Sequence, residues 1–268
     1  MKLAAVFACS LGMLASPRAV AADPVSPPRE TVVLLHGLGR TRWSMSRLAS
    51  ELARDGYRVV NLTYPSRSLP LETLAHEWLP RELRAAQVDD APRVHLVTHS
   101  MGGILVRLWL RDAAPPPNLG RVVMLAPPNA GSEVADRLNA FPPFRWFTGA
   151  NGRRLGTAPD ALPRALGPWT TPAPLGVIAG DRALNPLFIP WLPGANDGKV
   201  TVASTHLAGE ADHLVVHHSH TWLGWHRDTI AQVKAFLRTG IFFRPGANEK
   251  ITVPAARPAA TGPARSRA

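Results

Sequence analysis

The chain passes from a strand pattern to a helix pattern at Val97-Thr98-His99-Ser100-Met101-Gly102-Gly103. Residues 93–98 contain Val94, Leu96 and Val97 and are partly β-branched, and residues 101–111 have apolar positions at helical spacing. A serine at such a reversal projects from a sharp turn, where small neighbours are needed because backbone segments approach closely. The pattern therefore predicts a nucleophilic serine at position 100, at the end of a buried strand.

A threonine departs from this pattern. Thr98 stands where glycine is usual, two residues before the serine, and threonine is larger and β-branched. A small-x-Ser-x-Gly pattern also arises by chance in about half of chains of this length, and Ser10 lies in a second copy of it. Only Ser100 follows a strand and opens a helix, so its context distinguishes it.

Short apolar runs alternate with helical patterns on both sides of this turn. Helices are expected at about 43–55, 71–87, 101–111 and 226–238. Strands are expected at 31–35, 57–62, 93–98, 121–126, 175–179 and 213–216. Apolar strands between helices predict an α/β fold, in which a mostly parallel sheet of about six strands has helices on both faces.

Two segments interrupt the alternation. Residues 127–173 are rich in Pro and Gly and contain Phe141, Phe144, Trp146, Phe147 and Trp169. We interpret them as a lid or acyl-binding cap inserted over the sheet, with a packed connection as the alternative. Residues 244–268 are basic and rich in Pro and Ala, and this composition predicts a disordered tail.

The first 22 residues have the features of a secretory signal peptide. Lys2 precedes an apolar run from Leu3 to Ala15, and small residues suited to cleavage after Ala21 or Ala22 follow. An uncleaved anchor is the alternative. Export would place the domain of residues 23–243 outside the cell or in the periplasm. The one cysteine, Cys9, lies in this leader, so the mature chain would have no disulfide and no reactive thiol.

The charge balance suggests a polyanion as a partner. The formal charge is +11, from 30 Lys+Arg and 19 Asp+Glu. No nucleic-acid-binding motif accompanies it, so we expect no nucleic acid partner. Much of the excess lies outside the predicted domain, where the basic tail is suited to weak contact with an anionic membrane surface. No later run approaches 18 apolar residues, so we expect the mature protein to be soluble; nothing in the sequence specifies its oligomeric state.

A serine hydroxyl needs a histidine base, a carboxylate that orients the base, and N–H donors for the developing oxyanion. His36-Gly37-Leu38-Gly39 follows the first predicted strand directly. The Leu38 and Met101 N–H groups are therefore the candidate oxyanion donors. The alternative for His36-Gly37 is an ordinary turn at a strand end.

Together these segments resemble the alpha/beta-hydrolase superfamily, in particular small bacterial secreted lipases and esterases, over about residues 30–243. The resemblance implies the alpha/beta-hydrolase fold, no cofactor, and the chain order nucleophile, acid, base. The matching segments are Val33-Leu34-Leu35-His36-Gly37, Thr98-His99-Ser100-Met101-Gly102-Gly103, Gly194-Ala195-Asn196-Asp197-Gly198-Lys199-Val200 and Ser219-His220-Thr221-Trp222-Leu223.

Two aspartates compete for the role of the acid. Asp181 directly follows the strand predicted at 175–179 and Gly180, which is where topology alone would place the acid. Asp197 follows a proline-rich loop, and its flanking residues resemble the acid-bearing turn of the family. We favour Asp197 and expect the other aspartate to act as a turn or cap carboxylate.

Several histidines near the end of the domain compete for the role of the base. His220 matches the family turn before the last helix and is favoured, with His217 and His218 as alternatives. So many imidazoles also raise the possibility of a metal cluster, but no ligand motif of fixed spacing accompanies them, and we expect no metal. His99 is expected to point away from the nucleophile and to be packed or hydrogen-bonded.

The sequence therefore predicts a serine hydrolase that cleaves carboxylic esters through an acyl-enzyme, with Ser100, His220 and Asp197 as the catalytic residues. Aromatic residues near the site, including Trp43 and residues 188–191, favour a small-molecule or lipid ester as the substrate. The same three residues also serve acyltransferases, thioesterases and amidases. A non-catalytic binding protein of the same fold is the alternative from another class.

Overall fold

The structure is a computed structural model, and it describes residues 29–184 and 187–244. Within this part of the chain, six strands form one sheet in the order β2-β1-β3-β4-β5-β6, and every neighbouring pair is parallel. The predicted parallel sheet of about six strands is therefore confirmed. The strands are β1 (Thr31–Leu35), β2 (Arg58–Leu62), β3 (Val94–His99), β4 (Leu119–Leu125), β5 (Leu175–Gly180) and β6 (Asp212–Val216).

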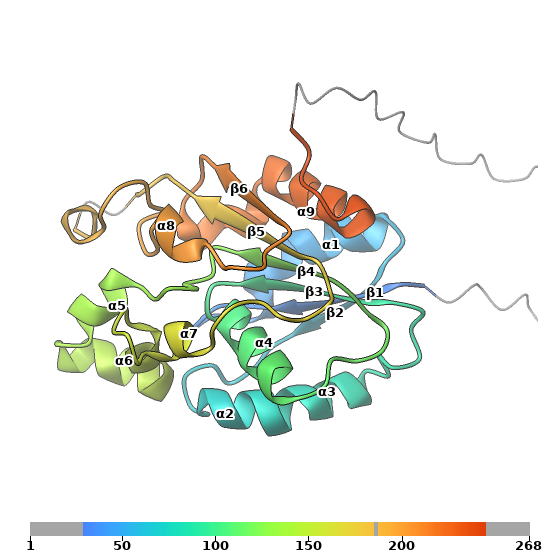
Figure 1. Ribbon diagram of the computed structural model, residues 1–268, viewed down its shortest axis with the longest axis horizontal. Helices are drawn as coiled ribbons and strands as arrows, with labels where there is room; N and C mark the ends of the chain where they lie inside the picture. Colours follow the sequence, from blue (N-terminus) through green and yellow to red (C-terminus); the bar gives the residue numbers. More distant parts are fainter. Residues whose placement is uncertain (1–28, 185–186, 245–268) are drawn as a thin grey trace, which may run out of the picture.

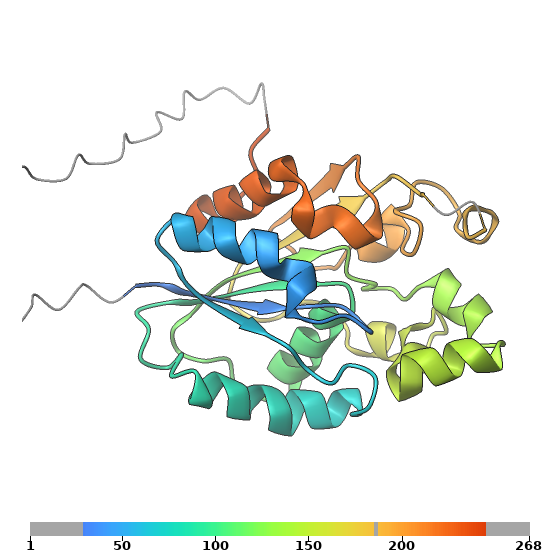
Figure 2. The ribbon, with the colours of Figure 1, turned by 180° about the vertical axis from the view of Figure 1, so that it is seen from behind.

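Helices cover both faces of the sheet (Figure 1). One face carries α1 (Ser46–Arg54), which follows the short helix η1 (Arg42–Met45), and α9 (Arg227–Thr239). The other face carries α4 (Met101–Asp112) and a helical run made of α2 (Leu71–Thr73), the π-helical turn η2 (Leu74–Trp78) and α3 (Leu79–Ala85). Figure 2 shows α1 and α9 side by side from behind.

The residues of β1 show why the sheet needs two layers of helices. Val32 and Leu34 lie in the apolar cluster beneath α1 and α9, whereas Val33 and Leu35 lie in the cluster beneath α2–α4. All four side chains are completely buried. Successive strand residues point to opposite faces, so an uninterrupted apolar strand is stable only when both faces are covered.

The predicted insertion lies between β4 and β5 and is largely helical. It contains α5 (Glu133–Leu138), α6 (Pro142–Gly152), η3 (Arg153–Leu155) and α7 (Leu162–Ala165). Figure 1 shows α5 and α6 beyond the end of the sheet to which the strands point. The loops after β5 and β6 reach the same edge and contain η4 (Ile189–Trp191), α8 (Val202–Thr205) and η5 (His220–Trp225).

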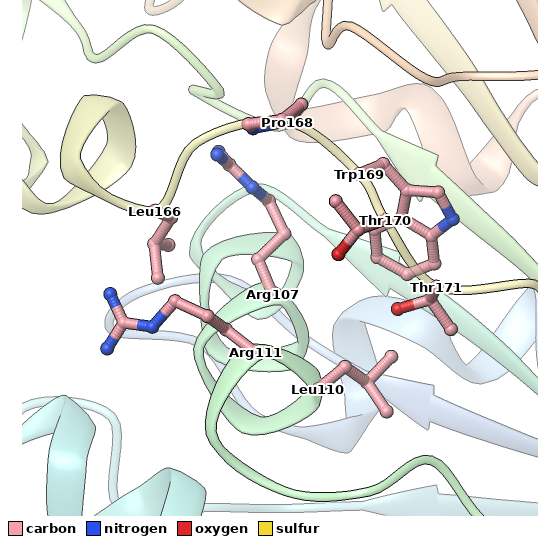
Figure 3. Close-up of a pocket in the computed structure, with 8 residues that line it drawn as sticks. All are labelled: Arg107, Leu110, Arg111, Leu166, Pro168, Trp169, Thr170 and Thr171. Carbon is pink, nitrogen blue, oxygen red and sulfur yellow. The ribbon is translucent and has the colours of Figure 1, made fainter.

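Arg107 ties both ends of this insertion to α4. Its buried guanidinium donates to the backbone carbonyl and the side-chain oxygen of Asn129, both at 3.1 Å, and to the carbonyl of Gly167 at 2.7 Å. Figure 3 shows it between Leu166 and Trp169, beside a small pocket that none of the candidate catalytic residues lines. Burial lowers the pKa of Arg107 to about 10, so it stays charged at neutral pH.

The two predicted terminal segments lie mostly outside the described residues. The predicted signal peptide, residues 1–22, and residues 245–268 of the predicted tail are not described. Arg244, the first residue of that tail, is held on the fold because its guanidinium donates to both carboxylate oxygens of Asp212, at 2.9 and 2.6 Å. None of the described helices is both long enough and apolar enough to span a bilayer.

Candidate active site

Ser100 lies at a sharp turn between β3 and α4, as predicted. Its backbone angles, φ 53° and ψ −123°, are rare for a residue with a side chain. The turn is held by a hydrogen bond from the Ser100 N–H to the carbonyl of Leu125, at 2.8 Å. Gly102 allows α4 to start here, because a Cβ at this position would lie 2.7 Å from the Leu35 carbonyl oxygen.

Thr98 lies beside Gly103 in the buried part of the elbow. Thr98 is completely buried at the end of β3, and a Cβ added to Gly103 would lie 3.4 Å from its hydroxyl oxygen. The same added Cβ would lie 3.1 Å from side-chain atoms of Met124 and Pro127. The elbow therefore forms with threonine, and without a glycine, at position 98.

The structure brings Ser100, His220 and Asp197 together in one hydrogen-bonded chain. The Nε2 atom of His220 lies 3.0 Å from the Ser100 hydroxyl oxygen, and its Nδ1 atom lies 2.7 Å from the Oδ2 atom of Asp197. The side chain of Asp197 is completely buried and that of His220 is 6% exposed. A histidine held between a carboxylate and a serine is arranged to take the hydroxyl proton.

Asp197 reaches His220 because its loop folds back onto the end of β5. A Cβ added to Gly180, the last residue of β5, would lie 2.9 Å from the Cβ of Asp197. The Oδ1 atom of Asp197 accepts the N–H groups of Lys199 and Val200, at 2.9 and 2.8 Å. The His220 N–H also donates to the Asp197 carbonyl, at 3.0 Å, which fixes the two loops to each other.

The competing residues form separate pairs outside this chain of hydrogen bonds. Asp181 lies 2.8 Å from the Nδ1 atom of His217, whose side chain is 76% exposed. His218 lies 2.7 Å from Asp228, in the first turn of α9. Of the alternatives that the sequence left open, Asp197 and His220 are the two residues that hydrogen bonds connect to Ser100.

His99 supports the candidate base, a role that the sequence did not reveal. As expected it is buried and hydrogen-bonded, but its partner is the His220 carbonyl, at 2.9 Å from Nε2. The two rings have centroids 4.9 Å apart, so His99 packs beside the base instead of pointing away from the site. Burial, with the neighbouring His220, holds the pKa of His99 well below its ordinary value. A neutral His99 can donate from Nε2 to that carbonyl.

The loop that carries Leu38 is held by a buried histidine. The Nδ1 atom of His36 lies 2.8 Å from the Gly37 carbonyl, and its Nε2 atom accepts the Tyr64 N–H at 3.1 Å. The Tyr64 hydroxyl donates to the His36 carbonyl at 2.6 Å, and the two rings stack at 4.2 Å. Burial lowers the pKa of His36, in agreement with a neutral ring that both donates and accepts.

The candidate oxyanion donors lie on either side of Ser100. A Cβ added to Gly37, the residue before Leu38, would lie 3.1 Å from the Ser100 Cβ, and Leu38 lines the same pocket as Ser100. Among the described residues the Leu38 N–H has no hydrogen-bond acceptor. Met101 opens α4, so its N–H has no partner within the helix. Both N–H groups are thus available to an incoming oxygen.

Buried neutral histidines make the stability of the fold depend on pH. Burial lowers the pKa of His36, His95 and His99, and that of His213 falls to about 4. In the unfolded chain each histidine binds a proton near pH 6.5, whereas in the folded protein it does so only at lower pH. The contribution of these histidines to the free energy of unfolding is therefore fully present above pH 6.5 and is lost as the pH falls below it. We expect the urea midpoint to decrease between pH 7.5 and 5.5. His213→Gln should flatten this decrease, and a midpoint that stays constant would contradict the prediction.

Ser100 opens into a pocket of about 440 Å³. The insertion supplies most of its apolar wall. The role of the insertion as a lid or acyl-binding cap stays a prediction. Of the aromatic residues named from the sequence, Phe144, Phe147 and Phe188 line this pocket, while Trp43, at 68% exposed, does not. The apolar residues from the insertion are Pro128, Val134, Ala135, Leu138, Phe144, Phe147 and Leu155.

Two other groups of side chains have the composition of metal sites: His206, Glu210 and His213, and His218, His226 and Asp228. In each group the two imidazoles are stacked, with centroids 3.7 and 3.6 Å apart and planes 18° and 3° from parallel. Ring nitrogen lone pairs lie in the ring planes, so nearly parallel rings do not direct them to one point. Neither group is therefore preorganised for an ion.

The fold and this site define a class: parallel α/β proteins with a serine at a strand-to-helix turn and an aspartate and a histidine on later loops. The chain belongs to the Alpha/beta hydrolase family, whose sequence profile matches residues 32–255.

Individual relatives agree with this assignment. A triacylglycerol lipase of Burkholderia plantarii is 32% identical in an alignment of 138 residues that covers 48% of this chain and only 38% of that protein. The mature lipase BlEst2 of Bacillus licheniformis has a TM-score of 0.58 at 20% identity, over 81% of this chain and 95% of that one. The type II thioesterase BorB from the borrelidin biosynthetic cluster has a TM-score of 0.50 at 20% identity, over 81% and 94%.

Proposed function

We propose that this protein is a secreted or periplasmic serine hydrolase that cleaves carboxylic esters through an acyl-enzyme. The observation that carries the proposal is the chain of hydrogen bonds from Asp197 through His220 to Ser100, at 2.7 and 3.0 Å. The pocket beside Ser100 has a mainly apolar wall, which suits an acyl chain. The similarity to a triacylglycerol lipase supports an ester substrate.

In the first half of the reaction, the Ser100 oxygen forms a bond to the ester carbonyl carbon while its proton passes to the Nε2 atom of His220. The Leu38 and Met101 N–H groups stabilise the negative charge that develops on the carbonyl oxygen. Asp197 orients the imidazole through Nδ1 and stabilises its positive charge. The bond to the alcohol then breaks, and His220 gives its proton to the departing oxygen.

In the second half, water replaces the alcohol. His220 takes a proton from the water, whose oxygen bonds to the acyl carbon. The bond to Ser100 breaks, the serine oxygen regains the proton from His220, and the carboxylic acid leaves. No group beyond the residues of this chain and the water is needed to balance the cycle.

The decisive experiment uses the purified mature protein, p-nitrophenyl esters of increasing acyl length, and a fluorescent alkyl phosphonate. We expect turnover of the esters and covalent labelling of one serine. Ser100→Ala should abolish labelling and lower kcat by at least about 10³-fold. Thr98→Ser, a change beside the nucleophile that keeps a hydroxyl side chain, should retain labelling. Labelling that survives in Ser100→Ala would overturn the assignment of the nucleophile.

A thioesterase is the second candidate, since BorB shares the fold. The site itself accommodates either leaving group, because His220 protonates an oxygen or a sulfur from the same position. Matched acetyl and butanoyl esters and thioesters of the same aromatic leaving group separate the two activities. A kcat/KM that favours the ester after correction for the uncatalysed rates supports the esterase.

A further inference from the structure

Two cationic side chains line the pocket that contains Ser100, and the mechanism uses neither of them. Lys199 is half-buried and follows Asp197 by two residues. Arg40 is exposed and follows the candidate oxyanion loop. The pocket lining contains no aspartate or glutamate. A cavity for neutral esters alone needs no such charges, because burying a cation without a partner is costly.

Neither cation has an ion-pair partner in the described part of the chain. In residues 29–184 and 187–244, no carboxylate forms an ion pair with Lys199 or Arg40, whereas cations elsewhere in the same segments do pair, as Arg154 does with Glu72. Burial and the nearby Arg40 lower the pKa of Lys199, while Asp197 opposes the shift more weakly. The two cations thus repel each other across the site, and a bound anion would relieve this repulsion.

Stabilising Asp197 does not account for Lys199. That carboxylate already accepts two backbone N–H groups at Oδ1 and the His220 ring at Oδ2. Three donors thus hold this carboxylate, and none of them is the Lys199 ammonium group. Its side chain instead lines two cavities that share His220: the main pocket, and a second one of about 210 Å³ with Thr221 and Trp222.

The positions of both cations point to the alcohol part of the ester. Arg40 donates to the Thr221 hydroxyl at 3.3 Å, next to His220 in the chain. Lys199 lines the cavity on the same side, which Ser219, His220 and Thr221 border. Asp197 also lines this cavity, but its carboxylate is held by the His220 ring and two backbone N–H groups. His220 is the group that protonates the departing alcohol, so the cations flank the path by which the alcohol leaves. The apolar wall for the acyl chain comes from the insertion instead.

Building on the proposed esterase activity, we propose that Lys199 and Arg40 form a subsite for an anionic group, a carboxylate or a phosphate, carried by the alcohol part of the ester. An ammonium and a guanidinium both bind such groups through charge-assisted hydrogen bonds. The substrate class is therefore an ester with an apolar acyl chain and a negatively charged alcohol. Binding of this anionic group leaves the mechanism of ester cleavage unchanged, because the subsite acts on the binding and orientation of the substrate.

The test compares two butanoyl esters of equal size, 3-(butanoyloxy)benzoate, which is anionic, and 3-(butanoyloxy)benzamide, which is neutral. The readout is the ratio of their kcat/KM values, each corrected for the rate of hydroxide hydrolysis. Lys199→Met should lower this ratio by about tenfold, the effect of one charge-assisted hydrogen bond. Arg40→Met, at an exposed position, should lower it by about threefold.

Two further variants serve as controls. Lys199→Arg keeps the charge and should restore most of the ratio. Arg84→Met removes an exposed cation from α3, remote from the pocket, and should leave the ratio unchanged. Raising the salt to 1 M, where the Debye length is about 3 Å, should weaken the preference of the unmodified protein. The salt dependence of the unmodified protein also tests the proposal if Lys199→Met fails to fold.

The proposal is overturned if Lys199→Met lowers kcat/KM for both esters by the same factor, because that is the effect of a structural role near Asp197. A preference that is insensitive to salt overturns it as well. A second comparison tests the acyl side, with mono-p-nitrophenyl adipate as the anionic ester and p-nitrophenyl hexanoate as the neutral one. If the protein prefers the anionic adipate but does not prefer the benzoate over the benzamide, the anion binds on the acyl side and the proposal is also overturned. Labelling of Ser100 by the phosphonate reports the esterase separately, so that activity can stand when this subsite fails.

Discussion

Replacing His220 by alanine is expected to lower kcat for ester hydrolysis by about 10⁶-fold, and Asp197→Asn by about 10⁴-fold. The alanine removes the only base within reach of the Ser100 hydroxyl among the described residues. The asparagine acts through the tautomer of His220. Its amide would donate an N–H to Nδ1 of His220, so Nδ1 must be the unprotonated nitrogen of the ring. The ring proton then lies on Nε2, which can no longer accept the proton of the Ser100 hydroxyl.

The rival pair of Asp181 and His217 provides matched controls. It joins the same residue types at 2.8 Å, on the loops that follow β5 and β6, but it does not contact Ser100. Asp181→Asn and His217→Ala should change kcat by no more than about twofold, as is usual for surface substitutions. Loss of activity in Asp181→Asn together with normal activity in Asp197→Asn would reverse the assignment of the acid. Circular dichroism and urea midpoints for all four variants verify that each is folded.

Changing Gly102 to alanine is expected to damage both stability and catalysis. The added Cβ would lie 2.7 and 2.9 Å from the carbonyl oxygens of Leu35 and His36, which are backbone atoms of β1 and the loop after it and cannot rotate away. Helix α4 must therefore move away from β1 and carry Ser100 with it. We expect a decrease of about 3 kcal/mol in the free energy of unfolding. A displacement of about 1 Å at the nucleophile also costs about 100-fold in kcat.

Gly103→Ala is the matched control on the same turn of α4. Its added Cβ would approach the side chains of Met124, Pro127 and Thr98 at 3.1 to 3.4 Å, and a methionine sulfur can shift. We expect a loss of about 1 kcal/mol and a kcat within about threefold of the unmodified protein. Equal losses of activity in the two variants would show that helix propensity, and not the contact with β1, controls the position of Ser100.

The strand and helix pattern was predictable because both faces of the sheet are buried. A mainly apolar strand such as β1, with every residue buried, is distinguished from its surroundings by composition alone. The helical segments 101–112 and 227–239 keep an apolar stripe and end near Asp112 and at Gly240, which adopts the left-handed conformation that ends helices. Local patterns of this kind need no knowledge of distant contacts.

The acid was harder to predict, because its position depends on a loop that reverses direction. Asp181 has the better position along the chain, directly after β5, whereas Asp197 is sixteen residues further along. Only the packing of Asp197 against Gly180 and its two backbone donors bring the later residue to His220. The support of His220 by His99 also depends on a contact between residues 121 positions apart.

The sequence by itself determined the order of the strands and helices and the turn at Ser100, because these follow from residue types and spacing within one segment. The tertiary structure decided which aspartate and which histidine meet Ser100, and which charged side chains enter the pocket. These choices are made by loops at the carboxyl edge of the sheet, where residues distant in the chain come together. Their free energies depend on contacts that no local pattern contains.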